Sequence, residues 1–400
     1  MSLAGSSEDA GDGPHASHRR QGVKVAVSVH GRFHGFDLAR ELNTQNALAG
    51  VLTTYPAYLV RRHVGNLDNL ATIPTLELQR RLCQRLRGVC GDVDGRISAV
   101  FGAFSARHLP ACDVLVGWSS ATLEAISVAH NRGARVVIER GSSHILHQTN
   151  VLSELYAQHG REFDGTSSRI IERELAEYEA ADLIAVPSTY AADTFTAHGV
   201  AAEKISVNPY GVDLSLFSPS LTVNRARAQI LFVGRVGLRK GVLELLHAFS
   251  GLSSDAGLCL VGPLETGLAQ PVQKDVDFRG SVPFASLPGY YHGADVFCLP
   301  SWEEGFPLVL LQAMASGLPV VATDATGAAD IVTPGVEGEI VPTGDVPALR
   351  EALDRMLSDP IRAKEMGAAA RKRVKDGFDW KSYGVRARST YAGLISNVAT

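Results

Sequence analysis

Short runs of mostly apolar residues, each ending at a polar or glycine-rich turn, recur along this chain. The first run is 23–29, with the sequence Val-Lys-Val-Ala-Val-Ser-Val. Runs that are apolar at successive positions are typical of strands in a parallel sheet covered on both faces. The same pattern predicts further strands at 47–53, 113–118, 134–139, from 182 onward, and at 229–234, 294–299 and 318–322.

Helical segments lie between these strands. One helix is predicted from about residue 37, others at 169–180 and 242–249, and another between Pro307 and Gly317. Alternating strands and helices indicate an α/β protein with parallel sheets. The chain has 400 residues, 45% of them hydrophobic, and 39 glycines, which suits two such domains.

The turn after the strand at 294–299 carries the clearest candidate chemistry. Residues 300–312 read Pro-Ser-Trp-Glu-Glu-Gly-Phe-Pro-Leu-Val-Leu-Leu-Gln, where Gly305 adds no bulk and Pro307 suits the first turn of a helix. Free amides and the helix dipole at such a turn can hold phosphate. Glu304 would repel phosphate, so it would instead grip neutral hydroxyls such as those of a sugar. The alternative is an ordinary helix start whose acidic residues complement the dipole.

Two basic residues follow the predicted strand at 229–234. Arg235 and Lys240 would lie at its carboxyl end, where doubly wound sheets bind ligands. Arginine offers a planar fork to phosphate oxygens, and lysine offers a point charge. Together they could offset the charge of a pyrophosphate leaving group without a metal. Either residue alone would be read as a solvated surface group, but their combination with Glu304 favours a site.

These segments resemble the family-4 retaining glycosyltransferases of the GT-B fold (glycosyl transferases group 1), which move a sugar from a nucleotide donor to an acceptor. The resemblance runs from about Val23 to Tyr383 and is densest from Asp182 onward. It implies two doubly wound, Rossmann-like domains that face a central cleft. The segments that carry it are 181–188, 205–213, 232–235 with 240–241, and 300–317.

The resemblance implies roles for individual residues. Arg235 and Lys240 would hold the donor diphosphate, and Glu304 would contact the transferred sugar. Backbone atoms near Val282 would meet the base. The remaining donor-binding residues that it implies are Gly31, Gly234, Gly305, Phe306, Pro307 and Leu308.

The N-terminal half supplies a candidate histidine. Arg140-Gly141-Ser142-Ser143-His144 follows the predicted strand at 134–139, and by resemblance His144 approaches the sugar near the reaction centre. His147 is the alternative. Gly31 lies in the first strand-to-helix turn, where glycine lets the backbone approach a ligand. The G-x-G-x-x-G spacing is absent, so this turn is not a dinucleotide-binding fingerprint.

One position departs from the family pattern. Eight residues after Glu304, where the family has a second glutamate that binds ribose hydroxyls, this chain has Gln312. Glutamine keeps an acceptor oxygen but loses the charge, and charge-assisted hydrogen bonds are stronger than neutral ones. We expect weaker donor binding, by about 1 kcal/mol, rather than loss of activity. The change also leaves open a weakly active or regulatory relative.

The predicted organisation has five parts. They are a disordered tail at 1–21, an N-terminal acceptor-side domain at 22–205, a linker at 206–225, a C-terminal nucleotide-sugar-binding domain at 226–378, and a helix at 379–400 that returns to the N-terminal domain. The tail is rich in Ser, Gly, Asp and His and has no apolar core, so we read it as neither a signal peptide nor a strand.

Charge and cysteine content narrow the function classes. A net charge of −4 argues against a general nucleic-acid binder. The chain has no run of 18 apolar residues, so no transmembrane helix is predicted. The chain has five cysteines, and two of them, Cys259 and Cys298, lie in predicted strands. An odd number of cysteines with two in the core is typical of reduced thiols in a cytoplasmic protein.

A basic helix at 76–87 suggests contact with a membrane surface. Three leucines recur every fourth residue among four arginines: Leu78, Leu82 and Leu86 with Arg80, Arg81, Arg85 and Arg87. Such a helix can lie on an anionic lipid surface, which would suit a lipid-linked acceptor at the inner face of a membrane. The commoner alternative is a helix with a solvated basic face and its leucines in the core.

Two Asp-x-Asp motifs raise the question of a metal. They lie at 92–94 and 275–277, and GT-A glycosyltransferases use such a pair to hold a divalent ion. The motif is common by chance, and Arg235, Lys240 and a helix start already supply positive charge. We therefore expect no metal and no other cofactor.

The sequence thus predicts a retaining glycosyltransferase. It would move a sugar from a UDP- or GDP-linked donor to a saccharide or lipid-linked acceptor, in surface-polysaccharide or glycolipid synthesis. No carboxylate stands out as a covalent nucleophile, so front-face displacement is the expected course. The rival functions are a GT-B nucleotide-sugar epimerase and a non-catalytic nucleotide-sugar-binding protein.

Overall fold

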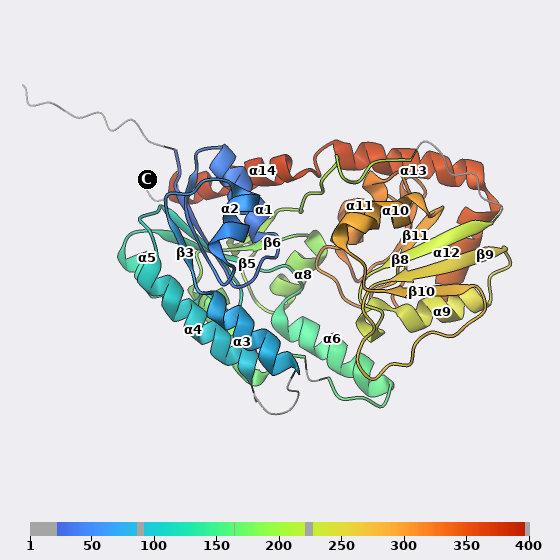
Figure 1. Cartoon of the computed structure of the whole chain (residues 1–400), viewed down its shortest axis with the longest axis horizontal. Coiled ribbons are helices and arrows are strands. Elements are labelled where there is room, and N and C mark those ends of the chain that lie inside the picture. The colour runs from blue at the N-terminus through green and yellow to red at the C-terminus, as the bar shows by residue number, and fades with distance from the viewer. Residues whose placement is uncertain (1–21, 86–91, 164, 221–226, 397–400) are drawn as a thin grey trace, which may run out of the picture.

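The computed structural model describes residues 22–85, 92–163, 165–220 and 227–396. It contains two parallel sheets, each surrounded by helices (Figure 1). The predicted tail at 1–21 lies outside the described residues, as do 221–226 of the predicted linker and 397–400 at the C-terminal end. The prediction of two doubly wound α/β domains is confirmed.

The N-terminal domain is built on a seven-stranded sheet with the order β3-β2-β1-β4-β5-β6-β7. Its strands are β1 (Val25–Val29), β2 (Leu48–Thr53), β3 (Leu70–Thr72), β4 (Val114–Trp118), β5 (Arg135–Glu139), β6 (Leu183–Val186) and β7 (Ile205–Val207). Its helices are α1 (Gly35–Thr44), α2 (Ala57–Val64), α3 (Pro74–Arg85), α4 (Val93–His108), α5 (Leu123–Asn131), α6 (Ile145–Gln158), α7 (Ser168–Ala180) and α8 (Thr189–Ala197), with a 3₁₀ turn η1 (Ala202–Lys204).

The C-terminal domain is built on a six-stranded sheet with the order β10-β9-β8-β11-β12-β13. Its strands are β8 (Ala228–Val233), β9 (Ala256–Val261), β10 (Val276–Gly280), β11 (Val296–Leu299), β12 (Val320–Thr323) and β13 (Gly338–Val341). Its helical elements are η2 (Leu238–Lys240), α9 (Val242–Ser250), η3 (Phe284–Ser286), α10 (Leu287–His292), α11 (Leu308–Ala315), η4 (Gly327–Asp330), α12 (Val346–Ser358), α13 (Pro360–Lys375) and α14 (Trp380–Ser396).

The apolar runs form the central strands because helices cover both faces of each sheet. All five residues of β1 and all four of β11 are buried. In each sheet the chain order reverses beside a central strand, between β1 and β4 and between β8 and β11. Ligands bind at such switch points, beyond the carboxyl ends of the strands. The two candidate loops therefore emerge at neighbouring places, after β8 and after β11.

The last helix, α14, leaves the C-terminal domain and packs on α1 of the N-terminal domain (Figure 1). Gly384 of α14 allows this close approach, because an added Cβ would lie 2.2 Å from the Cβ of Glu41. The hydroxyls of Tyr383 and Tyr391 donate to the buried carboxylate of Glu139, at 3.4 and 3.3 Å. None of the helices in the described ranges combines the length and apolarity needed to span a membrane.

Candidate donor-binding site

The loops after β8 and β11 are joined by two adjacent ion pairs. Lys240 Nζ contacts the Glu304 carboxylate, and Arg239 Nη2 lies 2.8 Å from Glu303 Oε2. Gly241 makes this approach feasible, because it has a positive φ of 64° and an added Cβ would lie 1.8 Å from the Pro300 carbonyl oxygen. The structure thus brings together Lys240 and Glu304, two residues predicted from separate segments.

The ammonium of Lys240 lies in an environment that disfavours its charge. Burial lowers the pKa of Lys240, and the nearby charge of Arg239 lowers it further, to about 7. The contact with Glu304 opposes this shift, because an adjacent carboxylate favours the charged form. A bound diphosphate would add negative charge and raise the pKa of Lys240 again.

Arg235, Arg239 and Lys240 line one cavity of about 950 Å³ between the two domains. Its opposite wall is formed by α6 and the segment after it, including Gln148 and Tyr156. Arg235 is exposed, which leaves its guanidinium accessible to a ligand. Arg235 and Lys240, the two cationic residues predicted to bind the diphosphate, therefore line the same cavity.

The turn at Gly305 lies where the two domains touch. An added Cβ on Gly305 would lie 2.5 Å from both the Gly141 carbonyl oxygen and the Ser142 Cα. Ser188 Oγ donates to the Gly305 carbonyl, and Phe306 is buried against the ring of Tyr210. Pro307 caps the start of α11. This turn therefore packs against the N-terminal domain in this arrangement.

Leu308 and Gln312 line a second interdomain cavity of about 660 Å³. Phe33 from the first strand-to-helix turn and Phe284 after β10 also line it, and each is 57% exposed. Gln312 Oε1 accepts a hydrogen bond of 2.9 Å from the buried Tyr291 hydroxyl. The predicted donor-binding residues are thus divided between two cavities rather than gathered in one.

Three other predicted residues occupy loops at the carboxyl ends of strands. Gly31 follows β1 with φ of 104°, and its N–H donates to Thr54 Oγ1 at 2.9 Å. Gly234 follows β8 with φ of 156°, and its carbonyl oxygen would lie 1.8 Å from a Cβ added to Gly262. Val282 is partly buried beyond β10. The glycines are therefore explained by local backbone geometry.

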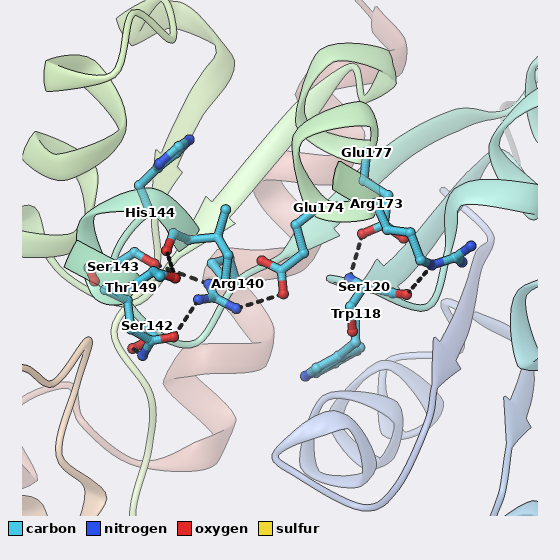
Figure 2. A network of polar contacts seen from close by, with 12 residues as sticks. Trp118, Ser120, Arg140, Ser142, Ser143, His144, Thr149, Arg173, Glu174 and Glu177 are labelled. Atoms are coloured by element: carbon cyan, nitrogen blue, oxygen red, sulfur yellow. Dashed lines mark hydrogen bonds and ion pairs between the residues drawn. The ribbon is translucent and has the colours of Figure 1, made fainter. Parts of the chain in front are cut away.

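His144 is held inside the N-terminal domain. It is buried, its Nδ1 accepts from Leu146 N at 3.3 Å at the start of α6, and its ring stacks on His198 with centroids 4.3 Å apart. Figure 2 shows the ring extending away from Ser142 and Ser143. Burial, and then the charge of His198, lower the pKa of His144 to about 4. His144 lines neither of the two cavities.

His147 is also placed outside the two cavities. It is half-buried, and its Nε2 lies 3.2 Å from the Tyr190 hydroxyl. Burial lowers the pKa of His147. Neither candidate histidine is therefore brought beside Lys240 in this arrangement.

Sequence reasoning missed Glu303 and the residues that surround it. The Glu303 side chain is fully buried and accepts hydrogen bonds from Ser142 Oγ and Ser143 Oγ, both at 2.7 Å, and from Gln148 Nε2 at 2.9 Å. Burial alone would raise the pKa of Glu303, but Arg239 and these donors lower it to about 2. The adjacent pairs Arg239-Lys240 and Glu303-Glu304 were the available signal.

The Asp-x-Asp motifs serve local structure. Asp92 caps α4 by accepting from Gly95 N at 3.0 Å. Asp275 pairs with Arg227, and Asp277 contacts Arg279. Among the described residues, no group of three or more His, Cys, Asp or Glu side chains is arranged to hold a metal ion.

Residues 217–373 match the family model described as glycosyl transferases group 1. The C-terminal domain belongs to this family. The chain is 34% identical over 229 residues to the MMP alpha-(1->4)-mannosyltransferase of Mycolicibacterium hassiacum, covering 54% of this chain and 55% of the relative. It is 31% identical over 240 residues to the GDP-mannose-dependent alpha-(1-6)-phosphatidylinositol monomannoside mannosyltransferase of Mycolicibacterium smegmatis, covering 53% and 63%. The matches thus span little more than half the length of these relatives.

Solved structures of similar shape extend the likeness to both domains of the chain. Sucrose-phosphate synthase from Thermosynechococcus elongatus aligns with a TM-score of 0.68 at 21% identity, covering 94% of this chain and all of that one. HepE from Anabaena, in complex with UDP and glucose, aligns with a TM-score of 0.65 at 17% identity, covering 93% and 100%. At such identities the likeness concerns the fold, which is GT-B.

Proposed function

We propose that the protein is a retaining glycosyltransferase that moves a hexosyl group from a nucleoside diphosphate sugar to a saccharide or lipid-linked acceptor. One observation carries the proposal. The neighbouring strands β8 and β11 bring Lys240 and Glu304 into contact at one edge of the C-terminal sheet, with Arg235 lining the same cavity as Lys240. A cationic pair beside a carboxylate suits a ligand that joins a diphosphate to a hydroxyl-rich sugar.

The proposed chemistry follows from this placement. The acceptor oxygen forms a bond to the anomeric carbon while the bond from that carbon to the diphosphate breaks on the same face. The acceptor proton passes to the leaving phosphate oxygen. Arg235 and Lys240 stabilise the negative charge that develops there, and Glu304 holds sugar hydroxyls. His144 and His147 would take part only after the loop at 140–147 rearranges.

We propose that the reaction needs no metal ion. The two cationic side chains supply charge where a divalent cation would otherwise act, and the Asp-x-Asp residues are engaged elsewhere. Turnover should survive treatment with EDTA. Loss of turnover that Mn²⁺ restores would overturn this part of the proposal.

The donor base is proposed as uracil or guanine. One relative is named as GDP-mannose-dependent, and one structure of similar fold is described in complex with UDP. The names of the mannosyltransferase relatives support an acceptor in glycolipid or surface-polysaccharide synthesis. We place the protein in the cytoplasm, at the inner face of a membrane where the acceptor is lipid-linked.

A panel of UDP- and GDP-linked hexoses tests the proposal through slow donor hydrolysis. At least one donor should be hydrolysed, with the α-anomer retained in the product seen by NMR. Lys240→Ala should reduce turnover by a factor of at least about 100, which corresponds to roughly 2.7 kcal/mol of transition-state stabilisation. Near-normal turnover in this variant would show that Lys240 does not stabilise the leaving diphosphate. A product with inverted anomeric configuration would exclude a retaining mechanism.

A non-catalytic nucleotide-sugar-binding protein is the second candidate. Gln312 favours it, because this residue lacks the charge of the family's glutamate and its oxygen is engaged by Tyr291. Binding of a nucleotide sugar without hydrolysis or transfer of any donor in the panel would support this candidate.

A further inference from the structure

Glu303 is a buried carboxylate whose partners come mostly from the other domain. It belongs to the turn after β11, whereas Ser142, Ser143 and Gln148 belong to the N-terminal domain. Its side chain is fully buried, and donors from four residues surround its two oxygens. Burying a carboxylate is costly unless it is paired and hydrogen-bonded, so this set is complete only while the domains are in contact.

The donors on the N-terminal side are also held by contacts within their own domain. Arg140 donates to the Ser143 carbonyl at 3.1 Å and to Gln148 Oε1 at 2.9 Å, and it pairs with Glu174 at 2.9 Å (Figure 2). Since Arg140 occupies the oxygen of the Gln148 amide, the amide nitrogen must face the other way. There it donates to Ser142 Oγ at 2.8 Å and to Glu303 Oε2.

The same contacts reach the proposed donor site through the backbone. Arg239 donates from Nε to the Glu303 carbonyl at 3.1 Å and from Nη2 to Ser142 Oγ at 3.3 Å. Arg239 and Glu303 directly precede Lys240 and Glu304 in the chain. Fixing the first pair therefore fixes the backbone from which the second pair projects.

We propose that Glu303 is a positioning residue at the centre of an interdomain latch formed by Glu303, Arg239, Ser142, Ser143 and Gln148. The latch forms when the domains close, and it sets Glu304 and Lys240 in place for sugar transfer. The effect of the latch on sugar transfer rests on the proposed function, but the closure of the domains does not.

The latch is tested first by the shape of the protein, without any substrate. Gln148→Glu replaces the donating amide by a carboxylate that faces Glu303 and repels it. Small-angle scattering should then show a larger radius of gyration than for the wild type. Gln158→Glu, an exposed position at the end of the same helix, is the matched control and should leave the radius unchanged. Equal radii in all three proteins, each folded by circular dichroism, would overturn the latch.

The kinetic test is a double-mutant cycle across the domain contact. Ser142→Ala and Glu303→Gln should each lower kcat about tenfold, while calorimetry shows the Kd for the nucleoside diphosphate changed by less than twofold. The double variant should lose about as much as either single variant, because one contact is removed in all three. A double loss of about 100-fold would contradict a shared latch.

The two tests separate the two proposals. If no donor is turned over by the wild type but Gln148→Glu opens the protein, the proposed function fails and the latch stands. If turnover is normal in Glu303→Gln and scattering is unchanged in Gln148→Glu, the latch fails and the proposed function stands.

Discussion

At the scale of single residues, Lys240 combines two opposing demands. Its ammonium must be charged to hold phosphate, yet burial, with Arg239 adding to it, lowers the pKa of Lys240 to about 7. The contact with Glu304 keeps it in place before a donor binds. A lysine in this state responds to pH within the physiological range, which an exposed lysine does not.

The pH dependence of donor hydrolysis should report this lysine. In the free enzyme the fraction of charged Lys240 falls as pH rises through about 7, so kcat/KM should decline above that pH, approaching tenfold per unit. The profile of kcat should stay flat to higher pH, because the bound diphosphate favours the ammonium. Lys240→Arg should remove the decline. A flat kcat/KM profile to pH 9 in the wild type would contradict the assignment.

Gln312 offers a gain-of-affinity experiment. Gln312→Glu places a carboxylate where the Tyr291 hydroxyl already donates, 2.9 Å away, in the cavity shared with Phe284. If ribose hydroxyls bind there, the charged acceptor should tighten nucleoside diphosphate binding by about 1 kcal/mol, roughly fivefold in Kd. Calorimetry with UDP and GDP measures it. Unchanged or weaker binding of both would show that the nucleoside lies elsewhere.

Some of these residues could be predicted from the sequence, and others could not. The contact of Lys240 with Glu304 follows from two turns at the ends of neighbouring parallel strands. Apolar runs and the glycine-containing turns after them indicate such strands and turns in the sequence. The bond from Ser142 to Glu303 joins residues 161 positions apart and depends on how two domains meet. His144 follows a strand, which made it look accessible, but Tyr178 of α7, Phe195 of α8 and His198 cover its ring.

At the scale of elements, α3 differs from the ordinary amphipathic helix. Leu76 is buried, but Leu78 and Leu82 are 60% and 49% exposed, so these two leucines of the predicted stripe do not lie in the core. Glu77 bonds to both Arg80 and Arg81, which reduces the local positive charge. Leu86 and Arg87 lie outside the described residues, and the described leucines leave an apolar strip facing solvent.

This exposed strip predicts weak membrane binding. The protein should float with vesicles that contain anionic lipid at low salt, because the leucines enter the interface and the arginines remain near the headgroups. The double variant Leu78→Ser, Leu82→Ser should lose most of this co-flotation. Val336→Ser, at a 47% exposed position of the C-terminal domain, is the control. Equal flotation of both variants, or none for the wild type, would exclude α3 as the contact.

At the scale of the whole molecule, two regions join the domains in different ways. The latch around Glu303 lies at the cleft, and its polar contacts can form and break. Helix α14 lies away from it and buries Tyr383 and Tyr391 beside Glu139 of the N-terminal sheet. A helix anchored by large buried side chains on one side and a set of polar contacts at the cleft on the other suits closure about α14, with the cleft as the part that opens.

The packing of α14 on α1 should therefore be sensitive to a single methyl group. Gly384→Ala would place a Cβ 2.2 Å from the Cβ of Glu41, close to the α1 backbone, so the helices must separate. We expect a loss of about 1–3 kcal/mol in the free energy of unfolding, seen as a lower Tm.

Gly393→Ala, on the same helix with nothing within 4 Å of its added Cβ, should instead raise stability by up to about 1 kcal/mol, because alanine favours helix. Opposite signs in the two variants would identify the helix contact, rather than helix propensity, as what fixes α14. Equal shifts of Tm would mean that α14 does not hold the N-terminal domain in this way.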